Sequence, residues 1–287
     1  MTMEDAMALT NRLLSQAQAL GAVTAYLRMG EEGKEADPAL RERIERIVDL
    51  LDARDALSGL SDQERSIVTS FARSYTRQAL ELMDEPFRPN SWTHSDATIL
   101  QAQGAASAIV ARLVAEAGLG GPNIRVLDIG TGVARLAIAF AGTFPRSTVV
   151  GLDPWEPAIS LARGNVKDAG LEDRVTVHQL RVEEYEDGDG FDLVWFPSFF
   201  IPGAAIDGAL RSVRGMLRPG GVVAMGVFER PDDPLAGAVD AMITVRSGGA
   251  VLEPVEAIAK MKAAGFTGAY ETKRTWQAPL RLIVGEK

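Results

Sequence analysis

The chain of 287 residues contains no cysteine and only two histidines, His94 and His178. Without a thiol it can form no disulfide, no thiol nucleophile and no cysteine-ligated zinc site. Two histidines make a multi-histidine site improbable, so we predict that no metal is bound. Uninterrupted apolar runs of about 18 residues are missing, and the first ten residues carry acids where a secretory signal carries positive charge. These absences predict a cytoplasmic protein without a membrane partner.

A basic stripe is also missing, and the formal net charge is −9. Proteins that bind nucleic acids usually present a basic face, because they neutralise phosphates. Here arginines alternate with glutamates, as in the run Arg41, Glu42, Arg43, Glu45 and Arg46. Such spacing is typical of a solvated helix face with ion pairs. We therefore predict no nucleic-acid partner.

Residues 1–118 are predicted to form an all-helical region. Leu40, Ile44, Ile47 and Leu51 recur at helical spacing, a capping box at residues 61–64 opens a helix to about residue 83, and another helix follows over about 96–117. These apolar stripes need a surface to bury them. We expect the earlier helices to form a homodimer, with a cap on a monomer as the alternative. We expect residues 91–103, next to the following domain, to form a lid.

Residues 119–287 show alternating strand and helix patterns, which predict an α/β domain with a doubly wound, mostly parallel sheet. Two strand-like runs at the end have no room for a helix between them, so they are predicted to form a hairpin. The expected strands are 124–129, 147–152, 174–178, 191–196, 221–228, 269–276 and 280–285, and the expected helices are 133–143, 156–169, 204–216 and 254–264.

The stretch from Val126 to Ala141 reads as a strand, a tight turn with Gly130 and Gly132, and a helix. Glycines let the backbone pass close to a small molecule, and the helix N-terminus presents free N–H groups at the same point. A dinucleotide fingerprint would have a third glycine where Arg135 stands. Asp128 would repel a pyrophosphate and could attract an ammonium group, or it could serve as a capping contact. This pattern favours S-adenosylmethionine over a nicotinamide cofactor.

Asp153 ends the second predicted strand, about 20 residues beyond Gly130. An acid at this place can hydrogen-bond a ribose diol. Alternatively it caps the helix that begins after Pro154. With the glycine turn already in place, we favour ribose binding.

Four segments, LDIGTGVARLAIAFA, VVGLDPWEPAISLARGNV, FDLVWFPSFFIP and LRPGGVVAMGVF, resemble in this order the class I S-adenosylmethionine-dependent methyltransferases. The helix at residues 91–114 is similar to the one that precedes the catalytic domain of bacterial small-molecule methyltransferases with an N-terminal helical region. The resemblance implies a seven-stranded Rossmann-like sheet with the hairpin at one edge. It also implies cofactor contacts from Asp128, Ile129, Gly130, Thr131, Gly132, Asp153, Pro154, Arg181, Val182, Phe196 and Pro197.

Two departures from the family pattern bear on specificity. Arg181 stands where such enzymes often place an aspartate for the adenine amine, and arginine cannot accept that hydrogen bond. The alternatives are that Arg181 stacks on the adenine, that Glu183 accepts instead, or that the Val182 backbone does. Pro197-Ser-Phe-Phe200 replaces the Asn/Asp-Pro-Pro-aromatic motif of enzymes that methylate adenine or glutamine nitrogen. Those two acceptor classes are therefore not expected.

The expected acceptor site is apolar, because aromatic residues gather after the fourth strand. We assign Trp92, Trp195, Phe199 and Phe200 to it, with core packing as the alternative. His94 is the candidate general base, and the alternative is a capping or surface histidine. The predicted function is methyl transfer from S-adenosylmethionine to a small, largely apolar metabolite, with oxygen slightly favoured over nitrogen or carbon. The rival prediction is a cofactor-binding dimeric protein without turnover.

Overall fold

The structure is a computed structural model that describes residues 2–29 and 36–287. The chain forms two compact units, residues 1–84 and residues 85–287. This division lies earlier than the boundary expected after residue 118. The reason is that the helix predicted over about 96–117 buries Val110, Leu113 and Val114 in the core of the second unit.

The first unit contains four helices among its described residues, α1 (Met3–Arg28), α2 (Pro38–Leu50), α3 (Arg54–Ser58) and α4 (Asp62–Asp84). The capping box predicted before α4 is confirmed, since the Ser61 backbone N–H donates to Glu64 Oε2 at 2.8 Å. Only Ile44 of the predicted α2 stripe is fully buried within the chain, while Leu40 and Leu51 are more than half exposed.

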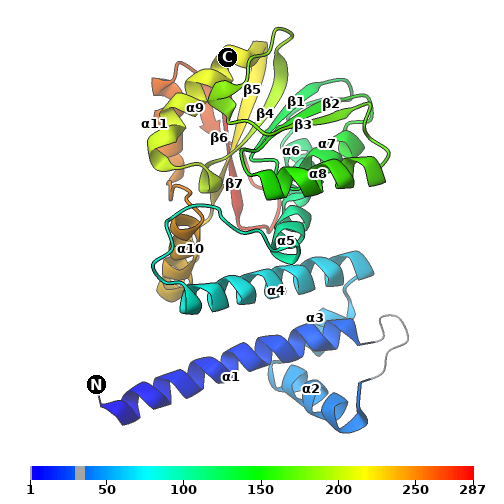
Figure 1. The fold of residues 1–287 in the computed structure, drawn as a ribbon, viewed down its shortest axis with the longest axis vertical. Coiled ribbons are helices and arrows are strands. Elements are labelled where there is room, and N and C mark those ends of the chain that lie inside the picture. The colour runs from blue at the N-terminus through cyan, green and yellow to red at the C-terminus, as the bar shows by residue number, and fades with distance from the viewer. Residues whose placement is uncertain (1, 30–35) are drawn as a thin grey trace. The chain divides into compact units, whose positions relative to one another are not determined.

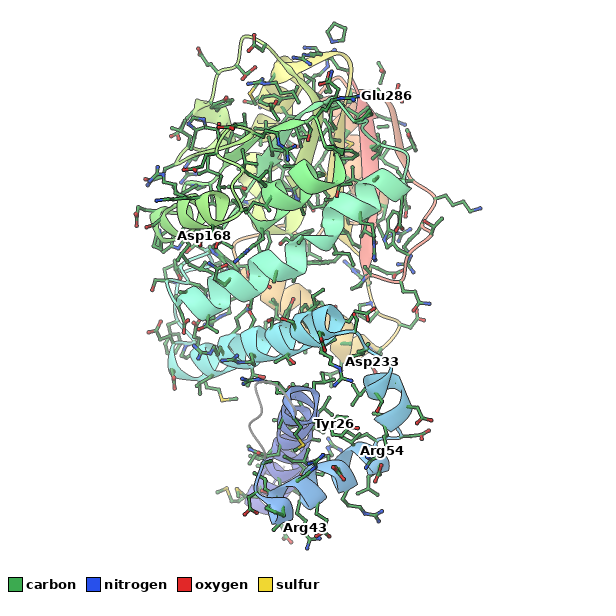
Figure 2. The ribbon with its side chains drawn as sticks, turned by 90° about the vertical axis from the view of Figure 1, so that its right-hand side faces the viewer. Tyr26, Arg43, Arg54, Asp168, Asp233 and Glu286 are labelled. Atoms are coloured by element: carbon green, nitrogen blue, oxygen red, sulfur yellow. The ribbon has the colours of Figure 1, made fainter. Side chains whose placement is uncertain are left out.

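Ion pairs lie among the exposed side chains of this unit. Arg54 donates to Asp49 at 2.6 Å and lies 5.9 Å from the ring centre of Tyr26, which Figure 2 shows beside it. Arg41 pairs with Glu45 across one helical turn at 2.9 Å. The alternating charged residues of α2 therefore form a solvated helix face, as predicted.

The second unit is built on a seven-stranded sheet with the order β3-β2-β1-β4-β5-β7-β6 (Figure 1). Strands β1 to β5 are parallel, and β7 runs antiparallel to both β5 and β6. The predicted fold class and the edge hairpin are confirmed. The strands are β1 (Arg125–Ile129), β2 (Thr148–Leu152), β3 (Val175–His178), β4 (Phe191–Pro197), β5 (Leu217–Phe228), β6 (Thr267–Glu271) and β7 (Leu280–Glu286).

Helices cover both faces of this sheet and bury a separate apolar cluster on each (Figure 1). Phe140 and Ala162 belong to one cluster, and Leu210 and Met261 belong to the other. The helices are α5 (Ala97–Ser107), α6 (Ile109–Glu116), α7 (Arg135–Thr143), α8 (Glu156–Asp168), α9 (Gly203–Met216), α10 (Pro234–Arg246) and α11 (Pro254–Ala263), with short 3₁₀ turns η2 (Val182–Glu184) and η3 (Ser198–Phe200).

Helix α10 was not predicted from the sequence. Its apolar residues do not form one buried stripe, and Leu235, Val239 and Met242 remain exposed. Its start carries a local signal that was overlooked. Asp233 accepts a hydrogen bond from the Ala236 backbone N–H at 2.7 Å, and Pro234 occupies the first turn.

The stretch Ala97–Glu116 is the one part of the described chain long and apolar enough to span a membrane by composition. It is broken at Ala108 into α5 and α6, and α6 packs on α7. Ile99, Leu100 and Leu113 are buried inside the unit. Core packing therefore accounts for the apolar character of this stretch.

Candidate functional site

The site begins at the turn between β1 and α7. Gly130 and Gly132 have φ angles of 65° and 54°, a left-handed backbone that side chains disfavour. Ala134 adopts φ 61° without being glycine, a conformation that costs free energy and is often found at functional sites. On β2, a Cβ atom at Gly151 would lie 2.6 Å from Thr131 Oγ1, so this glycine leaves room for the turn.

Asp128 lies beneath this turn and is only 1% exposed. Thr131 Oγ1 donates to its Oδ2 at 2.7 Å, whereas its Oδ1 is buried without a hydrogen-bond partner among the described residues. Burial, with the charge of Asp153 adding to it, raises the pKa of Asp128 to about 7. A buried acceptor with no partner is costly, and an ammonium group would satisfy it. The residues present thus fit the amino acid end of S-adenosylmethionine.

Asp153, at the end of β2, faces the same turn. Its Oδ2 accepts the Gly132 backbone N–H at 2.9 Å, and its Oδ1 accepts the Trp155 backbone N–H at 2.8 Å. Burial raises the pKa of this carboxyl. The Trp155 contact is a local turn and not the predicted cap, since α8 has no side-chain cap hydrogen bond. The Gly132 contact brings the carboxylate to the glycine turn, and the ribose role stays a prediction. Each oxygen keeps a lone pair that a ribose hydroxyl could use.

The residues predicted for the adenine end lie after β3. Val182 is buried in the core, so only its backbone could contact a ligand. Arg181 is exposed, and its backbone N–H donates to Glu184 Oε2 at 2.9 Å. Neither side chain offers an acceptor for the adenine amine, and the role of Arg181 stays a prediction.

The residues at the end of β4 divide into those that fill the core and one that lies at the glycine turn. Phe196 is fully buried, and Trp195 packs so closely on β5 that a Cβ at Gly226 would lie 2.4 Å from its ring. Core packing therefore accounts for Trp195, which had been assigned to the acceptor pocket. Pro197 lies against the glycine turn, with its Cγ 3.5 Å from the Cβ position of Gly130. This contact brings the end of β4 next to the start of α7.

Phe199 and Phe200 point to different neighbours. Phe199 stacks on Phe228 with ring centres 4.1 Å apart, and Phe200 meets the edge of Trp92 at 5.2 Å. Trp92 in turn meets the ring of His94 at 4.7 Å. Phe200, which is distant in sequence, thus joins Trp92 and His94 in one aromatic wall.

His94 is 3% exposed, which contradicts the alternative of a surface histidine. The helix cap at this point belongs to Asp96, whose Oδ1 accepts the Thr98 backbone N–H at 2.7 Å. The His94 carbonyl accepts the Trp155 indole N–H at 2.7 Å. This bond ties the chain before α5 to Trp155, two residues after Asp153, a contact that no local sequence pattern could have revealed. His178 lies on β3 beside Tyr185, at 5.5 Å between rings.

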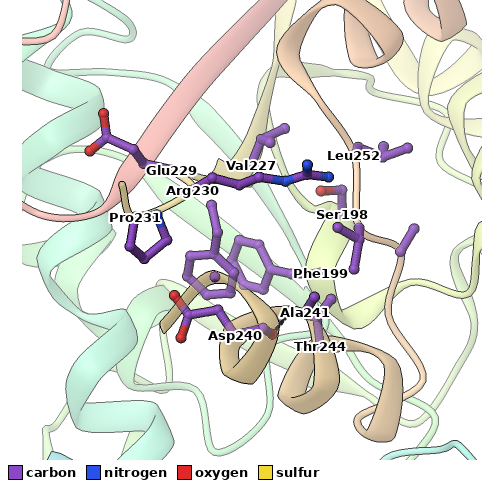
Figure 3. A pocket seen from close by; sticks show the side chains of 14 residues that line it. Ser198, Phe199, Val227, Glu229, Arg230, Pro231, Asp240, Ala241, Thr244 and Leu252 are labelled. Carbon is purple, nitrogen blue, oxygen red and sulfur yellow. Dashed lines mark hydrogen bonds between the residues drawn. The ribbon is translucent and has the colours of Figure 1, made fainter. Parts of the chain in front are cut away.

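A small pocket that opens to solvent lies on the β5 side of Ser198. Figure 3 shows Phe199 at its centre, Arg230 above it and Asp240 below. Arg230 pairs with Glu253 at 2.7 Å, and Glu229 pairs with Arg274. This cavity does not include the glycine turn or Asp153, so it is separate from the expected cofactor position. Within residues 2–29 and 36–287, no three His, Asp or Glu side chains gather as a metal would need.

A family model described as a methyltransferase domain matches residues 126–221, which include the glycine turn and Asp153. Residues 126–221 therefore form a methyltransferase domain. The predicted family and cofactor are thereby confirmed.

Curated relatives match only part of the methyltransferase domain. The methyltransferase GfsG of Streptomyces halstedii is 34% identical over 103 residues, which cover 35% of this chain and 36% of GfsG. The release factor glutamine methyltransferase of Rhodopirellula baltica is 36% identical over 74 residues, 25% of each chain. The matches therefore span about a quarter to a third of these relatives.

Solved structures match over almost the entire chain at low identity. Human N-acetylserotonin methyltransferase in complex with S-adenosylmethionine covers 98% of this chain and 97% of its own, with TM-score 0.69 and 15% identity. PigF with S-adenosylhomocysteine covers 100% of both chains, with TM-score 0.69 and 22% identity. An O-methyltransferase family protein from Burkholderia thailandensis covers 100% and 98%, with TM-score 0.66 and 15% identity. This chain shares their fold, N-terminal helices included.

Proposed function

We propose that this protein transfers the methyl group of S-adenosylmethionine to a small, largely apolar metabolite, with oxygen as the favoured acceptor atom. The observation that carries the proposal is the buried, partnerless Oδ1 of Asp128 beneath a turn that Asp153 also contacts. The aromatic wall of Trp92, His94 and Phe200 lies next to this arrangement through the Trp155 bond.

The full-length structural neighbours support the small-molecule class. One acts on N-acetylserotonin, as its name states, and another belongs to the O-methyltransferases. The glutamine and adenine methyltransferases among the curated relatives match only a fraction of their length. Pro197-Ser-Phe-Phe200 replaces the polar motif that those acceptors need.

Bound S-adenosylmethionine supplies an activated methyl group, so the protein mainly aligns the acceptor and excludes water. Asp128 and Asp153 would hold the amino acid end and the ribose of the cofactor, and Pro197 would limit the space near its methyl group. Phe200 and Trp92 offer apolar surface to the acceptor. His94 would receive a proton if the acceptor hydroxyl has to lose one.

A protein that binds the cofactor without turnover is the rival proposal, and the exposed Arg181 keeps it open. We expect the purified protein to convert S-adenosylmethionine to S-adenosylhomocysteine in a small-metabolite extract, measured by mass spectrometry. Tritium from the labelled methyl group should enter an organic-soluble product. Label in RNA or protein would contradict the proposed acceptor class. Binding of S-adenosylhomocysteine without any turnover would favour the rival.

We further propose that the first unit forms a homodimer. The first half of α1 leaves Met7, Leu13 and Leu14 about half exposed, which is an unusual loss of apolar burial for a helix. Sedimentation is expected to give a dimer, and Leu14→Glu should shift it toward monomer. The control Arg12→Glu changes charge on the same helix without removing apolar area. A wild-type monomer would refute the dimer.

A further inference from the structure

The segment Ser91–Asp96, called the strap here, passes α10 and leads into α5 (Figure 1). It is held at both ends. A Cβ atom at Gly248, just beyond α10, would lie 3.0 Å from Ser91 Cα, and Asp96 caps α5. Between these ends, Trp92 meets Phe200, the last residue of η3. The strap therefore carries part of the aromatic wall.

Trp155 connects the strap to the cofactor turn through two different groups. Its backbone N–H donates to Asp153 Oδ1, and its indole N–H donates to the His94 carbonyl. The other oxygen of Asp153 holds the Gly132 N–H. Trp155 thus links Asp153, the carboxylate predicted to bind the ribose, to the middle of the strap.

The indole ring also packs in a small apolar cluster with Trp92, Leu100, Val133 and Ala158. Val133 directly follows Gly132, and Leu100 belongs to α5. Trp155 therefore packs against a cluster that joins the residue after Gly132 to the helix behind the strap. Movement of the turn would be transmitted to the strap through both contacts.

We propose that Trp155 is a positioning residue that couples cofactor binding to the aromatic wall at the acceptor side. A ligand that fixes Asp153 and Gly132 also fixes Trp155, and through the indole bond it fixes the His94 carbonyl and Trp92. Bound cofactor would therefore stabilise the acceptor wall, which favours binding of the cofactor before the acceptor. The proposal rests on the cofactor position given above and needs no knowledge of the acceptor.

Hydrogen exchange with S-adenosylhomocysteine as the probe tests this coupling. In the wild type, the ligand should slow amide exchange both at residues 128–133 and in the strap. Trp155→Phe keeps an aromatic ring and the backbone N–H to Asp153, but it loses the indole N–H. In this variant we expect slowing at residues 128–133 only. The strap should exchange about five-fold faster than in the bound wild type, the factor of one net hydrogen bond.

Trp276→Phe is the matched control, because the Trp276 indole N–H also donates to a backbone carbonyl, that of Leu280, at 2.8 Å. In Trp276→Phe the ligand should still slow amide exchange at residues 128–133 and in the strap, even if the substitution lowers the stability of the protein. If bound ligand slows residues 128–133 without slowing the wild-type strap, the coupling is refuted. Equal slowing of the strap in Trp155→Phe refutes it as well. If the wild-type turn itself shows no slowing, the cofactor position is wrong and the coupling is refuted with it.

Discussion

Asp153→Ala is expected to raise the dissociation constant for S-adenosylhomocysteine by about 100-fold or more. The variant loses any ribose hydrogen bonds and also the two bonds that the carboxylate accepts from Gly132 and Trp155. The turn would then have to be ordered by the ligand itself. Titration calorimetry at constant pH and salt measures the change.

Two further substitutions separate these effects. Asp153→Asn keeps one oxygen as an acceptor, but its amide group cannot accept a backbone N–H, so an intermediate loss is expected. Asp207→Ala removes an exposed carboxylate paired with Lys260 and should leave the affinity unchanged. If Asp153→Ala binds the ligand as the wild type does, the predicted ribose site is misplaced.

The stability of the ligand-free protein is expected to fall as the pH rises from about 4 to about 7, through Asp128. The unfolded carboxyl has a pKa of 3.8, and burial raises the folded pKa to about 7. Between these values the folded state keeps a proton that the unfolded state releases, so deprotonation favours unfolding. The contribution of this proton to stability is fully present below the pKa of the unfolded carboxyl, and it is lost as the pH rises through the folded pKa. The loss is on the order of 4 kcal/mol.

Urea unfolding at a series of pH values measures this effect. Asp128→Asn cannot ionise and should lack this part of the pH dependence. Asp207→Asn, an exposed carboxylate given the same substitution, should keep it. A wild-type curve that matches the Asp128→Asn curve would contradict a raised pKa. Cofactor binding should depend on pH in the opposite direction from stability, because the ammonium group of the cofactor favours the ionised carboxylate of Asp128. The affinity for the cofactor should therefore rise as the pH passes about 7.

Several features could be predicted from the sequence because they depend on residues close together in the chain. The order of strands and helices follows from alternating apolar patterns, and the capping box at Ser61 and Glu64 is a local hydrogen-bond pair. The tight turn predicted at Gly130 and Gly132 is a local feature too, and both glycines adopt the positive φ that such a turn favours. The methyltransferase domain and its cofactor follow from these local signals.

Other features were decided only by tertiary contacts. Trp195 lies in β4 and Phe200 follows that strand, in one aromatic stretch of sequence, yet Trp195 fills the core against Gly226 and Phe200 joins the aromatic wall. The unit boundary after Asp84 depends on where α5 and α6 bury their apolar residues. The bond from Trp155 to His94 joins residues 61 positions apart. No periodic pattern encodes such a pair, because its geometry exists only after the sheet has brought the end of β2 beside the chain that enters α5.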